Sequence, residues 1–272
     1  MRRGCKTYEG YKIMKMSVLV PTLGQREKEI IRLLDSLQNQ NYDNYEIVIV
    51  TQVNHDFIKQ TISGYKNMDI IQVKINETGL SKARNRGLEV ATGEIVLLSD
   101  DDCWYPSYAL SSIADKFKIH NNVKILLTQI YDPMKKELYK QYSKKEGYIS
   151  NKLQLMRKSS IEIAFKRNMI SYSKFDERFG LGSEFVCGEE LDFLLNNYAK
   201  NTIFYTPKIT VYHKKKESSS NNKQIIAKGA IYGKNFNVFI CLLVLVRDLI
   251  IKRENNFKYF WEGYNEYFKR TN

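Results

Sequence analysis

The chain has 272 residues, 43% hydrophobic and 27% charged, a composition that excludes an intrinsically disordered protein and fits one large domain with an appendage. Its 43 lysines and arginines against 30 aspartates and glutamates give a net charge of +13, so nucleic acid, an anionic membrane surface or a phosphorylated substrate is the expected kind of partner. The first 16 residues are basic but lack the apolar stretch of a secretory signal, so we expect a cytoplasmic protein.

Apolar runs and helical periods alternate in the N-terminal part of the chain. The predicted strands are short apolar runs at residues 16–22, 45–50, 68–75 and 93–100. Residues 27–40 place isoleucines and leucines at helical spacing, and residues 79–91 predict a helix entered from a glycine turn. This alternation predicts a parallel α/β sheet with right-handed crossovers, in which ligands bind outside the carboxyl ends of the strands.

The pattern weakens after residue 110. It predicts, in chain order, a helix at 111–120, a strand at 123–131, a basic and mobile connection at 135–152, a glycine-rich loop running into a helix at 175–200, and two short strands at 201–213. A polar run follows, and residues 236–251 form an apolar segment flanked by lysines and arginines. We therefore expect a main α/β domain and a separate C-terminal tail.

Three consecutive aspartates, Asp100 to Asp102, directly follow the apolar run IVLL. Adjacent carboxylates repel each other unless water or a cation separates their charges. They stand at the carboxyl end of a predicted strand, where a ligand is expected, and hard oxygen ligands suit Mg²⁺ or Mn²⁺ bound together with substrate phosphates. A solvated aspartate-rich turn is the alternative.

Four segments, taken together in their order and spacing, resemble the family 2 glycosyltransferases, which have the GT-A fold. They are SVLVPTLGQ, GLSKARNRGLEVATGEIVLLSDDDCWYP, FDERFGLGSEFVCGEELDFLL and VYH, and they cover about residues 16–213. The resemblance implies a mostly parallel, Rossmann-like nucleotide-binding sheet flanked by helices, with a C-terminal helical tail. It also implies an inverting transferase that uses Mn²⁺ or Mg²⁺ and moves a sugar from a nucleotide-diphosphate sugar, with a UDP-sugar favoured.

The same resemblance implies which residues bind the donor. Asp102 corresponds to the metal ligand and Asp101 to its neighbour toward the sugar nucleotide, with Asp100 as the third acid. The family usually spaces these acids as D-x-D-D, and this chain has Ser99 at the first of those positions. The division of roles among the three aspartates therefore stays open. The remaining donor-binding candidates are Pro21 and Thr22 in the first loop, Arg84 and Lys82 on the glycine-led helix, and Gln52, which with Thr51 stands where the family usually has an aspartate.

Inversion needs a general base to take the proton from the acceptor hydroxyl. In the segment GEELDF, Glu190 corresponds to the family's base, Glu189 is its rival and Asp192 is a third candidate. Acidic side chains in a first helical turn are also common partners of the helix dipole, which is the alternative for all three. His213 falls where many family members place a histidine that contacts the metal or a phosphate; a lone histidine at a strand end is otherwise ordinary.

These implications divide the chain into an N-terminal extension (1–15), a GT-A catalytic domain (16–213) and a basic, apolar helical tail (214–272). Within the catalytic domain, residues 16–110 form the nucleotide-sugar half and 111–213 the acceptor half. The apolar segment of the tail is shorter than the ~20 residues that span a bilayer, and its basic flanks predict peripheral binding to the anionic inner face of the cell membrane. A buried helix or a dimer contact, hence a homo-oligomer, is the alternative.

The expected acceptor is a saccharide or a lipid-linked saccharide in the synthesis of a capsule, exopolysaccharide or lipopolysaccharide, as the resemblance implies. Two rival functions come from other classes of protein. A nucleotidyltransferase would also use aspartates at strand ends with Mg²⁺, but it has no use for GEELDF. A nucleic-acid-binding protein is indicated by the charge, yet the basic residues crowd around an apolar segment in the C-terminal third, so we expect no nucleic-acid partner.

Overall fold

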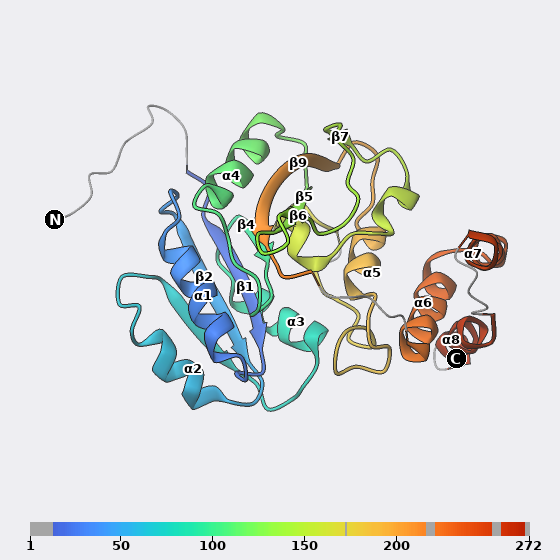
Figure 1. Cartoon of the computed structure of the whole chain (residues 1–272), viewed down its shortest axis with the longest axis horizontal. Helices are drawn as coiled ribbons and strands as arrows, with labels where there is room; N and C mark the ends of the chain where they lie inside the picture. Colours follow the sequence, from blue (N-terminus) through green and yellow to red (C-terminus); the bar gives the residue numbers. More distant parts are fainter. Residues whose placement is uncertain (1–12, 172, 216–220, 252–256, 270–272) are drawn as a thin grey trace.

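The structure is a computed structural model that describes residues 13–171, 173–215, 221–251 and 257–269 (Figure 1). Most of the predicted N-terminal extension therefore lies outside the described residues. Strands and helices then alternate as predicted: β1 (Met16–Thr22), α1 (Glu27–Gln38), β2 (Tyr45–Thr51), α2 (His55–Ile62), β3 (Ile70–Lys74), α3 (Leu80–Val90) and β4 (Ile95–Leu98).

The first four strands are parallel and lie in the order β3-β2-β1-β4. The chain passes from β1 to β2 on one side, whereas β4 pairs with the other side of β1. This reversal of direction leaves a crevice at the carboxyl ends of β1 and β4, the usual position of a ligand in an open α/β sheet. Thr22 and the three aspartates are thereby placed at the same edge.

The second half extends the sheet with mixed strand directions. Its elements are α4 (Ala109–Ile119), β5 (Ile125–Asp132), β6 (Glu137–Leu138), β7 (Gly147–Tyr148), β8 (Ile163–Lys166), α5 (Glu189–Asn196) and β9 (Ile203–Tyr212). β8 lies antiparallel between β4 and β5, and β9 is parallel to β5. The predicted α/β class is confirmed, with the parallel part at its N-terminal side. The basic connection predicted at 135–152 contains β6 and β7, which pair with β5 and β9.

One strand replaces the two short strands predicted at 201–213. Its pairing with β5 jumps from Leu127↔Tyr205 to Gln129↔Ile209, so the exposed Pro207 lies in a bulge. A proline has no N–H to donate to a strand ladder and is tolerated where the ladder is interrupted. The strand then resumes its pairing and carries His213 to the crevice at its end.

Side chains of β1 alternate between two apolar cores. Met16, Val18 and Val20 pack on the side of α1, α2 and α4, whereas Leu19 packs on the side of α3 and α5. Both cores are fully buried at these positions, since helices cover both faces of the sheet (Figure 1). The continuous apolar runs in the sequence follow from this three-layer arrangement.

Three helices follow the sheet and lie at one side of it (Figure 1). They are α6 (Asn222–Asn235), α7 (Val238–Ile251) and α8 (Phe257–Lys269). α6 and α8 touch through their backbones, because a Cβ atom on Gly229 would lie 1.9 Å from the Phe260 carbonyl oxygen and one on Gly263 would lie 1.9 Å from that of Ile226. Within the described residues, every helix is too short or too polar to cross a membrane.

Candidate active site

The carboxyl ends of β1 and β4 border a cavity, as the strand order requires. Thr22 donates a hydrogen bond from Oγ1 to Asp101 Oδ2 at 2.6 Å, and the Gly24 N–H donates to the same hydroxyl at 2.9 Å. The cavity has a volume of about 480 Å³. Its lining includes these predicted site residues: Pro21, Thr22, Gln52, Asp100, Asp101, Asp102 and His213.

The mouth of the cavity brings opposite charges together. Arg26 Nη1 lies 3.0 Å from Asp101 Oδ1 and 2.6 Å from Asp102 Oδ2, and His213 Nε2 lies 3.1 Å from Asp102 Oδ1. Burial raises the pKa of Asp101, while the Thr22 hydroxyl and the Arg26 guanidinium oppose that rise. These contacts reduce the mutual repulsion of adjacent carboxylates.

Sequence analysis missed several residues that line the cavity. Arg26 and Gln25 come from the loop after β1, Thr78 from the loop before α3, and Leu181 and Gly182 from the loop before α5. The position of Arg26 could have predicted its place in the cavity, because a basic residue in the loop after the first strand faces the acidic motif that follows the neighbouring strand. The apolar and glycine residues carried no signal, because nothing in their type indicates a ligand.

Arg84 lies beneath the cavity and not in its lining. Its side chain is fully buried, with Nη2 3.1 Å from Asp100 Oδ1 and Nη1 2.9 Å from Glu189 Oε1. One guanidinium therefore connects the aspartates after β4 with the first turn of α5. Burial raises the pKa of Asp100, and Arg84 opposes that rise. This bridging position between two carboxylates favours a structural role for Arg84, and its contact with a nucleotide stays a prediction.

Lys82 also lies outside the cavity lining. It precedes Arg84 by two positions on α3, so the two side chains leave different sides of the helix. Lys82 Nζ lies 2.5 Å from Glu77 Oε2 at the surface, and its role as a nucleotide ligand stays a prediction. Gln52, by contrast, lines the cavity, and its Oε1 accepts a hydrogen bond from the Gly79 N–H at 2.7 Å, which fixes the turn before α3.

Glu189 and Glu190 occupy the first turn of α5 but differ in their surroundings. Glu189 is buried in its ion pair with Arg84. Glu190 is only partly covered, and loss of hydration together with the adjacent Glu189 raises the pKa of its carboxyl above the usual range. A carboxylate with raised proton affinity is suited to general-base chemistry, and Glu190, unlike Glu189, has no ion pair with Arg84 among the contacts described above.

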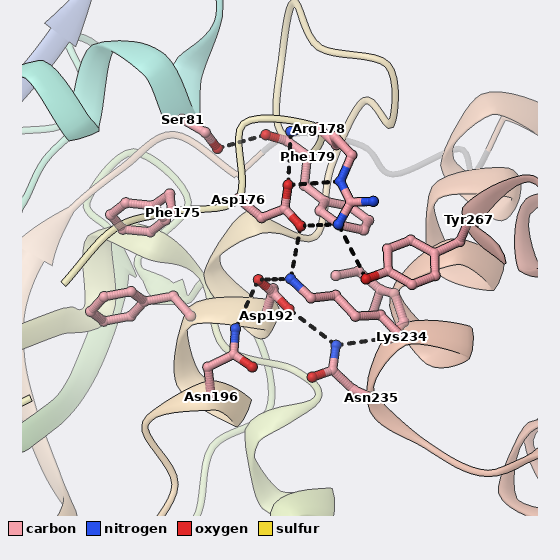
Figure 2. Close-up of polar contacts among 12 residues, drawn as sticks. Ser81, Phe175, Asp176, Arg178, Phe179, Asp192, Asn196, Lys234, Asn235 and Tyr267 are labelled. Carbon is pink, nitrogen blue, oxygen red and sulfur yellow. Dashed lines mark hydrogen bonds and ion pairs between the residues drawn. The ribbon is translucent and has the colours of Figure 1, made fainter. Parts of the chain in front are cut away.

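Asp192 has a structural environment. Its carboxylate is buried, with Lys234 Nζ 2.8 Å from Oδ2 and the Asn235 amide donating to Oδ1 at 3.1 Å (Figure 2). The Asn196 amide donates a further hydrogen bond to Oδ2 at 3.1 Å. These contacts hold Asp192 against α6 and outside the cavity lining, so they favour a structural role, and its role as a third candidate base stays a prediction.

The loop at 175–185 connects the cavity to the C-terminal helices. Asp176 Oδ2 lies 2.8 Å from Lys234 Nζ of α6 and 2.6 Å from Arg178 Nη2. Arg178 in turn donates to the Tyr267 hydroxyl of α8 at 3.1 Å (Figure 2). Burial raises the pKa of Asp176, but the hydrogen bonds from Arg178 and Lys234 outweigh burial and hold that pKa well below its usual range. A wall of the cavity is therefore held in place by α6 and α8.

Asp102 and His213 have the geometry to share a divalent cation. Their oxygen and nitrogen atoms lie side by side and line the cavity. Among the described residues, no three His, Cys, Asp or Glu side chains are grouped to hold a metal by themselves. Since Mg²⁺ and Mn²⁺ often take one or two protein ligands and complete their coordination with substrate phosphates, this donor set fits a metal bound together with a diphosphate.

Comparisons of sequence give named relatives. The chain is 28% identical over 209 residues to the GalNAc(5)-diNAcBac-PP-undecaprenol beta-1,3-glucosyltransferase of Campylobacter jejuni. This match covers 73% of this chain and 64% of the relative. It is 33% identical over 120 residues to the poly(ribitol-phosphate) beta-N-acetylglucosaminyltransferase TarS of Staphylococcus aureus, covering 42% of this chain and 21% of TarS. The chain thus matches less than two thirds of the length of these relatives.

Comparisons of structure give the same kind of fold. A crystal structure of S. aureus TarS in complex with UDP matches with a TM-score of 0.65 at 21% identity, over 90% of this chain and 74% of that one. The mannosyltransferase PcManGT from Pyrobaculum calidifontis, in complex with GDP-Man and Mn²⁺, matches with a TM-score of 0.58 at 16% identity, over 82% and 63%. At these identities the likeness shows the fold alone.

A family model described as glycosyl transferase family 2 matches residues 17–179. This range includes the strand-end loops, the three aspartates and α3, and it covers more than half of the chain. Other relatives include the amylovoran biosynthesis glycosyltransferase AmsB of Erwinia amylovora, 36% identical over 103 residues, or 35% of this chain and 33% of AmsB. The protein therefore belongs to glycosyl transferase family 2 and is related to glycosyltransferases of bacterial polysaccharide synthesis.

Proposed function

We propose that the protein transfers a sugar from a nucleotide-diphosphate sugar, with inversion, to a saccharide or lipid-linked acceptor in the synthesis of a cell-surface polysaccharide. The observation that carries this proposal is the cavity at the carboxyl ends of β1 and β4. Three aspartates, an arginine and a histidine line this cavity of about 480 Å³. Such a cavity suits a polar ligand that brings its own negative charge and a cation. Family membership gives no support to the nucleotidyltransferase alternative.

Asp102 and His213 would hold the Mn²⁺ or Mg²⁺. A bound divalent cation would offset the charge that develops on the leaving diphosphate, which is worth several kcal/mol in enzymes of this kind. The Thr22 hydroxyl fixes the carboxylate of Asp101 beside them. Arg26 is about half exposed, so its guanidinium can leave the two aspartates and pair with a diphosphate instead.

Glu190 would act as the general base. Its carboxylate would take the proton of the acceptor hydroxyl as that oxygen bonds to the anomeric carbon, while the bond to the diphosphate oxygen breaks on the opposite face of the sugar. Glu189, held in its pair with Arg84, lies next to Glu190 and raises the pKa of Glu190. Arg84 positions both sides of the site, because it contacts Asp100 and Glu189 at once.

A uridine diphosphate sugar is the donor that we favour. Two of the related TarS crystal structures are described as complexes with UDP and with UDP-GlcNAc. The names of two sequence relatives mention an undecaprenol-linked glycan and a poly(ribitol-phosphate). These names support an acceptor that is a growing, carrier-bound polymer. Thr51 and Gln52 end β2 beside the cavity, and they are the positions from which base selectivity would be read.

Thermal unfolding with donor sugars tests this function without knowledge of the acceptor. A ligand at a hundred times its Kd stabilises the native state by about 2.7 kcal/mol, which corresponds to a rise in Tm of about 5–10 °C for a protein of this size. We expect that rise with a UDP-sugar plus Mn²⁺, and much less with EDTA, GDP-sugars or dTDP-sugars. The variant Asp102→Asn should lose the metal-dependent part of the rise. Stabilisation by single-stranded nucleic acid alone would refute the proposal.

Replacing Arg26 by Ala should increase the affinity for Mn²⁺ about fivefold. The arginine contacts both Asp101 and Asp102, and a cation that binds there must displace two ion pairs worth up to about 1 kcal/mol in total at such exposure. Titration calorimetry of Mn²⁺ into the protein, without any nucleotide, measures the change. Arg86→Ala removes an equal charge from an exposed pair with Glu89 and should leave the Mn²⁺ affinity unchanged. Equal affinities in the Arg26 variant and the wild type would contradict this competition.

A further inference from the structure

One face of α7 is apolar over its whole length and exposed. The exposed apolar residues recur at the spacing of one side of a helix: Val238, Phe239, Leu242, Leu243, Val246, Leu249 and Ile250. Arg247 is the exposed charged residue among the described part of α7, and it pairs with Asp248. Their exposed fractions range from 41% for Leu242 to 70% for Ile250. A soluble protein rarely leaves such a continuous apolar surface in water, so something is expected to cover it.

The opposite face of α7 fixes the helix to the protein. Cys241, Val244 and Leu245 are buried in the core that α6 and α8 also form. Asp248 is buried as well, in ion pairs with Lys228 of α6 and with the neighbouring Arg247. The exposed face therefore belongs to a helix that is packed on the protein through its other face, and α7 itself lies at the end of the molecule away from the parallel strands (Figure 1).

The length of α7 indicates how it would meet a bilayer. Its 14 residues extend about 21 Å at 1.5 Å per residue, which is short of the ~30 Å hydrocarbon core. A helix with one apolar face and one face packed on protein can bury that apolar face at the level of the lipid headgroups while lying flat. The geometry therefore fits a surface contact and not a span.

Charge distinguishes a lipid surface from a second copy of the chain. Residues 222–272 contain nine lysines and arginines against four aspartates and glutamates, and the whole chain has a net charge of +13. Two copies that met through α7 would bring like charges together, whereas an anionic bilayer attracts them by roughly 1 kcal/mol for each nearby cation. Charge complementarity thus favours anionic lipid over self-association.

We infer that the exposed face of α7 docks on an anionic lipid bilayer, with its apolar side chains among the headgroups and the net positive charge of the protein favouring the lipid phosphates. This surface is separate from the cavity between β1 and β4, since no α7 residue lines that cavity. The inference does not depend on the proposed reaction. It places a polymer acceptor carried by a membrane lipid within reach of the same molecule.

Sedimentation with vesicles tests the docking. Wild-type protein should pellet with vesicles of phosphatidylcholine and phosphatidylglycerol, and about tenfold less with phosphatidylcholine alone. The double variant Leu243→Glu/Leu249→Glu should lose at least about tenfold of the binding to anionic vesicles, because each leucine contributes apolar burial that a glutamate cannot. Ile119→Glu/Met134→Glu adds the same charge at equally exposed apolar sites on other elements and should bind like the wild type.

Two further measurements test whether the variants are folded and whether the protein forms a dimer through α7. All variants should keep the thermal shift with UDP-sugar and Mn²⁺, which shows that they are folded and separates failure of docking from failure of the proposed function. Equal binding of both double variants to anionic vesicles would overturn the inference. A dimer in sedimentation velocity that dissociates only in the α7 variant would overturn it too, because the covering partner would then be a second copy.

Discussion

Replacing Glu190 by Gln is expected to lower kcat by a factor of about 10²–10⁴ and to leave the KM for the donor sugar nearly unchanged. General-base catalysis by a positioned side chain contributes an acceleration of this size, and an amide cannot accept the proton of the acceptor hydroxyl. The donor cavity does not include Glu190 in its lining, so donor binding should not change. Initial rates over a range of donor concentrations separate the two constants.

Glu190→Asp provides the matched control for that experiment. It keeps a carboxylate at the start of α5 but withdraws it by one methylene, so a partial activity between wild type and Glu190→Gln is expected. Glu189→Gln tests the rival candidate, and it should also weaken the pair with Arg84 and lower stability. Full activity in Glu190→Gln would move the base to another residue.

The pH dependence of kcat should follow the titration of Glu190. Burial and the negative charge of Glu189 raise the pKa of this carboxyl, and only its deprotonated form can act as a base. The rate should therefore rise with pH through a value above the usual glutamate range and level off beyond it. The rising limb should be absent from the residual activity of Glu190→Gln. A rate that levels off below pH 5 would show that an ordinary carboxylate is the base.

Replacing Arg84 by Met is expected to destabilise the protein by about 3–5 kcal/mol. The guanidinium is fully buried between Asp100 and Glu189, and its removal leaves two carboxylates without their counter-charge. Denaturation by urea measures the loss. Arg84→Lys restores the charge but cannot reach both acids with one planar fork, so only partial recovery is expected. A loss below about 1 kcal/mol would contradict the bridging role.

The sheet and the acidic edge of the cavity could be predicted because both depend on local pattern. Continuous apolar runs identified strands covered on both faces, and the rule for strand ends predicted that Asp100 to Asp102 and Thr22 lie in one crevice, as they do. His213 lies in the same crevice, at the end of β9, which is one bulged strand where the sequence pattern predicted two strands. An interruption in a strand ladder looks like a turn when only the residue types are known.

The pairing of charges could not be predicted in the same way. Arg84 and Lys82 are two positions apart on one helix, and sequence alone does not say which of them faces the core. Arg84 meets Glu189 from 105 positions away, so no local pattern reports the contact. The same holds for Asp192, whose partner Lys234 belongs to a helix that the polar sequence after β9 did not indicate. A carboxylate's role depends on these distant partners more than on its position in a motif.

The contacts between the 175–185 loop and the last helices restrict how relatives could exchange parts by recombination. Asp176 and Lys234 are 58 positions apart, and Arg178 and Tyr267 are 89 apart, so each pair must be inherited together. A chimera with its crossover between α5 and α6 would combine a loop from one parent with helices from the other and lose these partners. A crossover between α4 and β5 keeps both of these pairs in one parent but separates Arg84 from Glu189 and Asp102 from His213, so the two parents would have to match at those positions as well.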